Sequence, residues 1–417
     1  MSLKRVEPED HENVAKSEYV YESKNNVVEI WREKNIWFFD DEEITESDET
    51  FLKRNDEALD QIVEDGFIRY PLFAARDNDG EQIEREAWLH PDFEPSCTEG
   101  FYEKHKMRTN IYVPSYKRAG KSKTIKMLEE FGVKNYYICI DPDQYEEYKK
   151  HYPLEHLLIR DVRFRLDEML TKISSFDRPM NMAGHSPLCN FTVALSRSLG
   201  EDYFTFSDDD FHGIAMKAHK NNWIYDPSPK KDGKYEKDNF FRCSRMKEEY
   251  GFNFQEFWGN LERYIIAARN PGFVGLERFG TVFSLPISLK KGTRVYSLYL
   301  TQNSTQPDHI GYQNNDVITS MENSKNGLVN VLSEGICYNS EQTQTGDGGQ
   351  SAMYHRFGTL DKGKILVRAH PNYSSIVDRY SRIHHAGNFN VYNKLRIVGA
   401  PLPHPDAHDG LPRDEDL

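Results

Sequence analysis

Three successive carboxylates, Asp208, Asp209 and Asp210, have the types and spacing that point most directly to chemistry. They follow the aromatic-rich run 202–206, so they lie where a strand would end. Adjacent carboxylates repel one another unless a cation or hydrogen-bond donors neutralise them, and such oxygen ligands suit Mg2+ or Mn2+. If the extended backbone continues, Asp208 and Asp210 share one side and Asp209 turns away. A metal site is therefore predicted, with an acidic loop or helix cap as the alternative.

Strands and helices that alternate from residue 110 onward must position these carboxylates. Apolar strands are predicted over 110–116, 136–141, 156–161 and 202–206, separated by helices over 121–132, 143–152 and 190–200. Strands without polar alternation indicate an α/β fold with a mainly parallel sheet covered by helices on both faces. The carboxyl ends of parallel strands meet at one rim, where ligands bind. That rim is expected to hold Pro114, Ser115, Tyr116, Arg118, Asp141 and the three aspartates.

The second half of the chain reads as a mixed extension of this sheet. Helices are predicted over 254–270 and 314–327, and strands over 276–287 and 293–304. The stretches 351–360 and 364–371 indicate a further strand or two and a loop. We therefore expect domains over 109–215 and 216–400, and a tail over 401–417.

The first hundred residues differ from the rest in charge. They hold 11 Lys and Arg against 28 Asp and Glu, within a net charge of -14 for 417 residues. An acidic run over 40–50 precedes a helical pattern over 51–67, so residues 1–108 are expected to form a small acidic α+β region. Basic residues elsewhere cluster at 117–126, 217–220, 228–237 and 288–294. A nucleic-acid partner is therefore compatible with the remainder, although solvated loops or helix faces explain each cluster equally simply.

Composition narrows the class of protein. Hydrophobic residues make up 38% and aromatic residues 13%, which is too aromatic for a disordered chain. No apolar run is long enough to cross a membrane and the first residues lack an apolar leader, so we expect a cytoplasmic protein with no membrane partner. Five scattered cysteines give no CxxC pair and are expected to be reduced thiols.

The order of these motifs resembles the GT-A nucleotide-sugar fold of glycosyltransferases. A first strand ends in Pro114-Ser115-Tyr116-Lys117-Arg118, a second ends in Asp141, a helix contains Asn190, and the aspartates follow. The resemblance implies a nucleotide-sugar donor held by Pro114, Ser115, Tyr116, Arg118, Asp141, Asn190, Asp208 and Asp209. It also implies Mn2+ or Mg2+ held by Asp208 and Asp210. Such an ion would stabilise the charge that the leaving diphosphate gains.

Two later motifs extend the resemblance. Asp316, in the pair Asn315-Asp316, resembles the acidic residue that removes a proton from the acceptor hydroxyl; the alternative is a helix N-cap. Many members have Glu-Asp there, so only Asp316 carries over. His385, in the run 382–388, resembles a late histidine that completes the metal shell; the alternative is a structural histidine.

Within that fold, three segments most resemble the glycosyltransferases associated with TET and J-base dioxygenases, found in bacteriophages. These segments are 111–128, 136–153 and 206–211, and the resemblance covers roughly residues 108–395. It implies metal-dependent transfer of a sugar, with a UDP-sugar as expected donor, to a hydroxymethylated pyrimidine in DNA. A phage-encoded enzyme would act in the host cytoplasm.

A DNA acceptor adds candidates for base stacking and phosphate contact. They are Tyr116, Trp223, Trp258, Arg278 and Tyr312, although each could be a packing residue instead. Strand contacts are expected at 217–237 and 288–294, and a mobile glycine-rich loop at 346–356.

Three alternatives stay open at this point. The first is a glycosyltransferase of the same fold with a glycan, protein or small-molecule acceptor. The second is a sugar nucleotidyltransferase, which the single glycine of 114–123 disfavours. The third is a non-catalytic DNA-binding module, whose function would survive loss of Asp208 or Asp210. The sugar, the stereochemical course and the oligomeric state are not determined by the sequence.

Overall fold

The computed structural model describes most of the chain between residues 18 and 398. The described ranges are 18–23, 26–31, 47–72, 85–94, 107–163, 185–219, 222–224, 247–248, 251–278, 289–304, 309–311, 313–340, 362–379, 382–392 and 394–398. Outside these residues lie Tyr312, the side chain of Trp223, most of the stretch 217–237 and all of the stretch 346–356. So does the tail 401–417.

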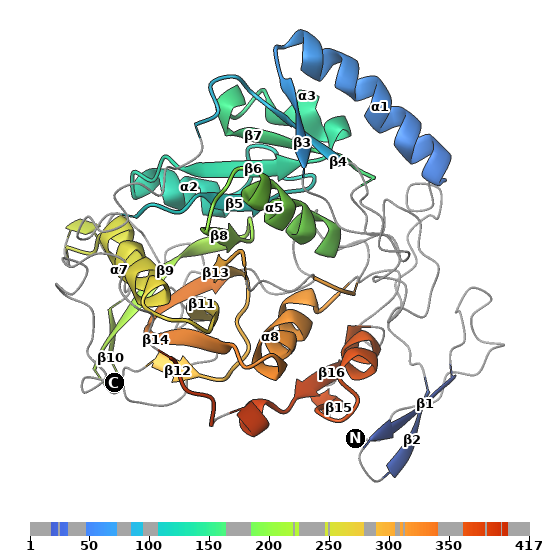
Figure 1. The fold of residues 1–417 in the computed structure, drawn as a ribbon, viewed down its shortest axis with the longest axis vertical. Helices are drawn as coiled ribbons and strands as arrows, with labels where there is room; N and C mark the ends of the chain where they lie inside the picture. The colour runs from blue at the N-terminus through green and yellow to red at the C-terminus, as the bar shows by residue number, and fades with distance from the viewer. Residues whose placement is uncertain are drawn as a thin grey trace, which may run out of the picture.

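One large sheet forms the centre of the described part of the chain (Figure 1). Twelve described strands belong to it, in the order β10-β9-β14-β11-β13-β8-β5-β6-β7-β4-β3, with β12 paired to β14. The central ones are β5 (Ile111–Pro114), β6 (Tyr136–Ile140), β7 (Leu157–Arg160) and β8 (Tyr203–Ser207). The others are β3 (Ile68–Leu72), β4 (Arg85–Leu89), β9 (Phe211–His219), β10 (Asn222–Ile224), β11 (Pro271–Arg278), β12 (Leu289–Lys291), β13 (Leu298–Gln302) and β14 (Val329–Ser340).

The four central strands form the expected parallel block. β5 pairs in parallel with β6 and β8, and β6 pairs in parallel with β7. Successive residues of β5 face opposite cores: Ile111 and Val113 pack with α2 (Lys123–Glu130) and α7 (Phe254–Ile266), and Tyr112 packs with α5 (Ser186–Ser198). Helices thus cover both faces, which explains why β5 to β7 are apolar at nearly every position. The structure confirms an α/β fold compatible with the GT-A architecture.

The second half adds strands of mixed direction beyond β8. β13 pairs antiparallel with both β8 and β11, while β11 and β14 run parallel. Helix α8 (Asn315–Lys325) packs against β11 and β14. The strand expected within 364–371 is wrong, because residues 362–369 form a helix whose Ile365 and Leu366 pack on α8. Short apolar runs suit buried helices as well as strands.

Part of the acidic N-terminal region belongs to the same sheet. β4 pairs antiparallel with β7, and β3 pairs antiparallel with β4. Between 47 and 72 the structure also contains α1 (Asp48–Glu64), which begins at the capping residue Ser47 and packs on the segment after β6. β1 (Glu18–Ser23) and β2 (Asn26–Trp31) form a separate hairpin. The boundary at residue 108 stays a prediction, although strands on both sides of it share one sheet.

A buried polar network supports the start of β5, at the end of the strand away from the aspartates. Trp258 is fully buried and donates from its indole Nε1 to Thr205 Oγ1 at 2.8 Å, so it does not stack on DNA. Glu262 accepts hydrogen bonds from the backbone N–H groups of Arg108 and Thr109 at 2.8 and 2.9 Å. Burial raises the pKa of Glu262 to about 7. Trp258 is therefore a core residue in this fold.

Two expectations from composition concern the cysteines and the helices. Cys139, Cys189 and Cys337 are buried free thiols, as expected. Among the described helices, none has the length and apolar character that a membrane span requires.

Glu201 gives a test of this buried network. Its carboxylate accepts from Tyr112 Oη at 2.8 Å and from the Asn110 amide, and burial raises its pKa from 4.5 to about 7. Because the pKa of Glu201 is higher in the folded than in the unfolded protein, its protonated form stabilises the fold. This contribution is complete below the unfolded-state pKa and is lost as the pH rises through about 7. Glu201→Gln does not titrate and can keep the contacts with Tyr112 and Asn110. Between pH 5 and 8 the free energy of unfolding of the wild type should therefore fall by about 2 kcal/mol more than that of Glu201→Gln.

The measurement is urea unfolding of both proteins across that pH range. Glu201→Ala serves as the contrasting variant, because it leaves buried Asn110 and Tyr112 polar groups unpaired and should cost about 2 kcal/mol or more at every pH. Parallel pH profiles for the wild type and Glu201→Gln would show that Glu201 does not titrate in this way.

Candidate active site

The three aspartates lie in the connection from β8 to β9, beside the carboxyl end of β5. Their backbone is held on two sides: the Asp208 N–H donates to the Ser297 carbonyl at 2.7 Å, and Thr124 Oγ1 donates to the Asp208 carbonyl at 2.7 Å. Ser122, the N-cap of α2, donates to the Asp209 carbonyl at 3.0 Å. The start of α2 and the segment before β13 therefore fix the position of these side chains.

Asp209 faces the tip of β5 and is neutralised there. Its Oδ2 accepts from Ser115 Oγ at 2.6 Å, and its Oδ1 pairs with Arg118 Nη1. The side chains of Arg118 and Asp209 are only 15% and 9% exposed, so this is a nearly buried, charge-assisted pair. The sequence predicted that Ser115, Arg118 and the aspartates share a rim, and the structure brings them together.

Asp208 is half-buried, and among the residues that the structure describes no lysine or arginine forms an ion pair with it as Arg118 does with Asp209. Burial, together with the nearby carboxylates of Asp316 and Asp209, raises the pKa of Asp208 to about 7, against opposing effects of Ser297 and Arg118. His185 Nε2 lies 3.8 Å from Asp208 Oδ1. The negative charge of Asp208 is therefore destabilised here, so a proton or a bound cation would relieve it.

Asp316 lies in the first turn of α8, close to Asp208. Its Oδ1 accepts from the Val317 N–H at 2.7 Å, while the N-cap position itself is taken by Asn314 with φ 59°. Burial raises the pKa of Asp316, opposed chiefly by the positive charge of Lys362. The helix start thus presents a carboxylate of increased basicity toward the end of β8.

His185 belongs to the site although the sequence analysis did not single it out. It is the residue before α5, which begins four residues earlier than predicted, at Ser186. Its ring contacts Phe206 edge to face, with centroids 5.3 Å apart. Burial lowers the pKa of His185, so the neutral imidazole is favoured. The available signal was His-Ser-Pro, since proline is favoured in the first turn of a helix.

Three expected site residues have other partners in this structure. The Asn190 amide binds the backbone of His309 twice: its Nδ2 donates to the carbonyl at 2.7 Å and its Oδ1 accepts from the N–H at 2.8 Å. Asp141 lies at the carboxyl end of β6 as predicted, but both its oxygens pair with buried Arg160. His385 Nδ1 lies 3.1 Å from Asn314 Nδ2, and its pKa is lowered to about 3 by burial and then by Lys362 and Arg294. Neighbouring cations disfavour metal binding at His385.

The remaining candidates lie as follows. Pro114 ends β5 and pairs in register with Cys139. Tyr116 and Asp210 are half-buried, and Lys117 Nζ lies 5.4 Å from the Tyr116 ring centroid. Arg278 ends β11, and its Nη2 donates to the Ser340 carbonyl at 3.5 Å.

The donor set was compared with the requirements of Mn2+ or Mg2+. Among the described residues, no three His, Cys, Asp or Glu side chains converge as a complete metal site. Such ions are commonly held by only one or two carboxylates, together with substrate phosphates and water. Asp208 fits that mode, because its charge is destabilised and Arg118 is engaged by Asp209. The described residues thus fit an ion that a phosphate-bearing substrate would help to hold.

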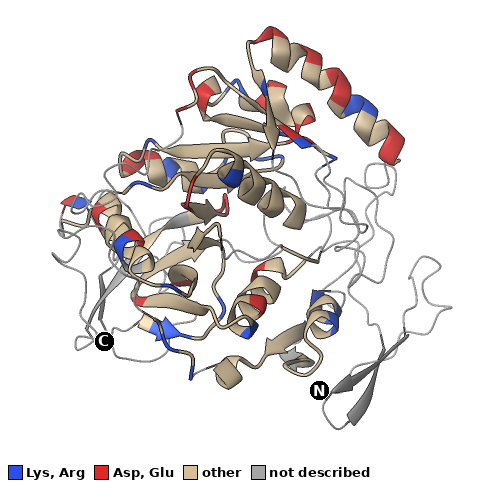
Figure 2. Ribbon diagram, in the orientation of Figure 1, with Lys and Arg blue, Asp and Glu red and all other residues tan. Residues whose placement is uncertain are grey.

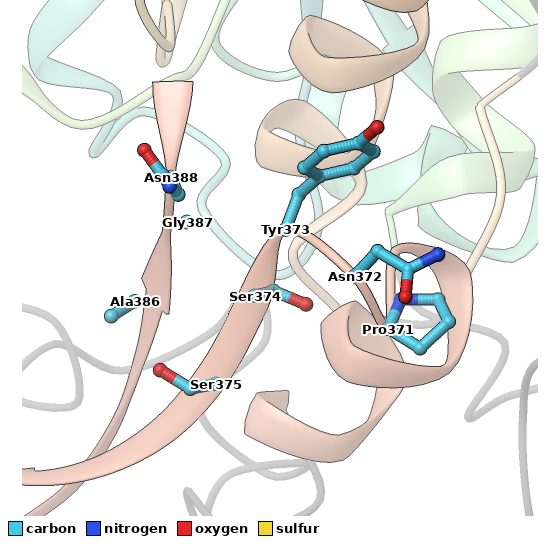
Figure 3. Close-up of a pocket in the computed structure, with 8 residues that line it drawn as sticks. All are labelled: Pro371, Asn372, Tyr373, Ser374, Ser375, Ala386, Gly387 and Asn388. Carbon is cyan, nitrogen blue, oxygen red and sulfur yellow. The ribbon is translucent and has the colours of Figure 1, made fainter. Parts of the chain in front are cut away.

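A shallow cavity of about 220 Å³ lies on a different part of the chain (Figure 3). It is lined by residues 371–375 and 386–388, from β15 (Ser374–Arg379), β16 (Arg382–Gly387) and the adjoining turns. None of the carboxylates described above contributes to it, so it is not the candidate active site.

Comparison with known protein families gives a match. Residues 109–349 match the family model described as TET-Associated Glycosyltransferase. This range is more than half of the chain and contains β5 to β14, the three aspartates, His185 and Asp316. No curated protein matches the chain.

The Arg118–Asp209 pair predicts a specific stability effect. Arg118→Ala leaves a nearly buried carboxylate without its cation, so the free energy of unfolding at pH 7 should fall by about 3 kcal/mol. The double variant Arg118→Ala/Asp209→Asn should recover part of that loss, because the orphaned charge is removed. Urea unfolding measures both.

Lys121→Ala is the matched control, since Lys121 is an exposed cation of the same loop. Its unfolding free energy should equal that of the wild type. A double variant less stable than Arg118→Ala alone would contradict the electrostatic explanation.

Proposed function

Because the chain belongs to the TET-associated glycosyltransferase family and is therefore a glycosyltransferase, we propose that it transfers a sugar from a UDP-sugar to a hydroxymethylated pyrimidine in DNA. The single observation that carries the proposed site is the pairing of two destabilised carboxylates. Asp208 follows directly after β8 and Asp316 lies in the first turn of α8; burial raises the pKa of both, and the carboxylate of Asp316 also raises the pKa of Asp208. One carboxylate can serve the donor and the other the acceptor.

Asp316 is proposed to act as the general base. The acceptor hydroxymethyl group is a primary alcohol with a pKa far above neutrality, so removal of its proton during attack lowers the barrier. The raised pKa of Asp316 makes it a stronger base than an exposed carboxylate. The Val317 N–H, which donates to Asp316 Oδ1, fixes one carboxylate oxygen and leaves the other for the substrate.

Asp208 and Asp210 are proposed to face the diphosphate of the donor. A divalent ion bound there supplies charge stabilisation for the leaving nucleoside diphosphate. Ser115 and Arg118 hold Asp209 and thereby fix the backbone that carries both neighbours. His185 lies beside Asp208 as a neutral side chain and adds no positive charge that would compete with the ion.

The DNA acceptor is supported by the family description and by charge. Lys117, Lys121 and Lys126 are exposed along the segment from β5 to α2, next to the aspartates, and Lys290 is exposed on β12. Phosphate groups of a DNA strand are bound by such side chains. The net charge of -14 favours instead a glycan, protein or small-molecule acceptor, which is the second candidate.

The test is transfer of a sugar to defined DNA. The full chain is incubated with Mn2+, a panel of nucleotide sugars, and duplexes containing hydroxymethylcytosine or hydroxymethyluracil, and the DNA is digested for nucleoside mass spectrometry. A hexose or pentose increment on the modified nucleoside is expected. If an oligosaccharide or the free nucleoside accepted the sugar while the duplex DNA gained none, the proposed acceptor would be contradicted.

Matched variants assign the two carboxylates in the same assay. Asp316→Asn and Asp208→Asn should each lower kcat by about a hundredfold or more, with a thermal unfolding temperature no lower than that of the wild type. Asp210→Ala should abolish transfer. Asp202→Asn, which alters an exposed carboxylate before β8, should retain full activity. Normal turnover by Asp316→Asn would exclude it as the base.

A further inference from the structure

Helix α1 is an addition to the family domain that packs beside the proposed donor site. It lies outside the matched range 109–349 and covers the segment after β6, which comprises a short 3-10 turn η3 (Pro142–Gln144) and α3 (Tyr145–Tyr148) (Figure 1). Acidic residues are spread along its length (Figure 2), yet one buried asparagine and one arginine of the helix contact the domain. A solvated helix would not need either contact.

Asn55 and Arg54 bind the same residue of that segment. The Asn55 side chain is completely buried; its Oδ1 accepts from the Asp143 N–H at 3.1 Å and its Nδ2 donates to the Phe51 carbonyl at 2.8 Å. Arg54 Nη2 lies 3.1 Å from Asp143 Oδ2. Asn55 therefore holds the backbone of Asp143, and Arg54 holds its carboxylate.

The need for Arg54 follows from the charges around Asp143. Burial and the carboxylate of Asp141 both raise the pKa of Asp143, to about 6, while Arg54 and Arg160 oppose this. Arg160 is itself paired bidentately with Asp141. Arg54 therefore supplies the cation that allows two neighbouring carboxylates to stay close at the end of β6.

The far side of the same segment holds the loop after β5. Gln144 Oε1 accepts from the Lys117 N–H at 3.1 Å. Tyr148 Oη lies 2.7 Å from Ser115 Oγ and accepts from the Arg118 N–H at 3.1 Å. Lys117 has φ 56°, a left-handed conformation that costs a lysine about 1 kcal/mol and persists only where contacts hold it.

Continuous contacts thus run from α1 to the aspartates. Asn55 and Arg54 fix residue 143, the segment 143–148 fixes residues 115–118, and Ser115 and Arg118 bind Asp209. We propose that α1 is a positioning element for the donor: through Asn55 and Arg54 it sets the affinity of the loop 114–118 for the nucleoside diphosphate. This inference rests on the proposed function, because that function places the donor against this loop.

The experiment is calorimetric titration of the full chain with UDP in the presence of Mn2+, followed by donor saturation kinetics. Asn55→Ala and Arg54→Ala should raise the Kd for UDP and the donor KM about five- to tenfold, with kcat at saturating donor unchanged. Arg54→Lys, which keeps the charge, should restore most of the affinity. Lys53→Ala is the control, since Lys53 is exposed and its Nζ lies 3.8 Å from Oε1 of Glu57, which is also exposed and belongs to the same helix.

The outcomes separate positioning from simple stabilisation. A purely structural role would lower the thermal unfolding temperature and the active fraction while the Kd for UDP stayed at the wild-type value, and that result would overturn the inference. Should Asn55→Ala fail to fold, Tyr148→Phe is the second variant. It removes the hydroxyl that contacts Ser115 Oγ and the Arg118 N–H, and it should raise the Kd for UDP in the same way.

The acceptor is not involved in this measurement, so the two proposals fail separately. If the α1 variants bind UDP more weakly but the wild type transfers no sugar to DNA, the inference stands and the proposed DNA acceptor is overturned. Wild-type protein that binds UDP, with variants of equal affinity, would overturn the inference alone. No binding of UDP by the wild type would overturn the proposed donor and the inference with it.

Discussion

Repulsion between carboxylates at the end of β8 is the constraint on which the rest of this structure depends. Asp208, Asp209 and Asp316 come from two distant stretches of chain and are brought into one half-buried region. Asp209 is neutralised by Arg118, whereas burial destabilises the charges of Asp208 and Asp316, and the carboxylates of Asp316 and Asp209 add to this effect at Asp208. The fold therefore holds two carboxylates in a state that favours a bound cation or a bound proton, which suits a transferase that must handle a diphosphate and an alcohol.

The parallel block makes this arrangement possible. β5, β6 and β8 end at one rim, and the loop after β5 reaches across to Asp209 while α2 holds the backbone of the aspartates. α8 then delivers Asp316 from beyond the antiparallel extension. The N-terminal region supports the opposite corner, since β3 and β4 lengthen the sheet past β7 and α1 braces the segment after β6. Strands outside the matched family range are therefore structurally continuous with it.

Sequence patterns were sufficient for the parallel strands and the rim, because apolar strands followed by polar tips have few other interpretations. They placed Ser115, Arg118, Asp208 and Asp209 together, as the structure does. They could not reveal side-chain partners: Asp141 pairs with Arg160 and Asn190 binds the backbone of His309, while the donor-binding roles of both residues stay predictions. His185 was missed because its helix was predicted to start too late, and residues 364–371 were misassigned because a short apolar run fits strand and helix alike.

The central claim is that Asp208 binds a divalent ion together with the donor diphosphate. Anomalous diffraction from crystals soaked with UDP and Mn2+ tests it most directly. The account predicts a manganese peak within coordination distance of the Asp208 carboxylate, with the diphosphate on its other side. Well-ordered UDP without manganese at Asp208, or manganese bound at His385 instead, would contradict it.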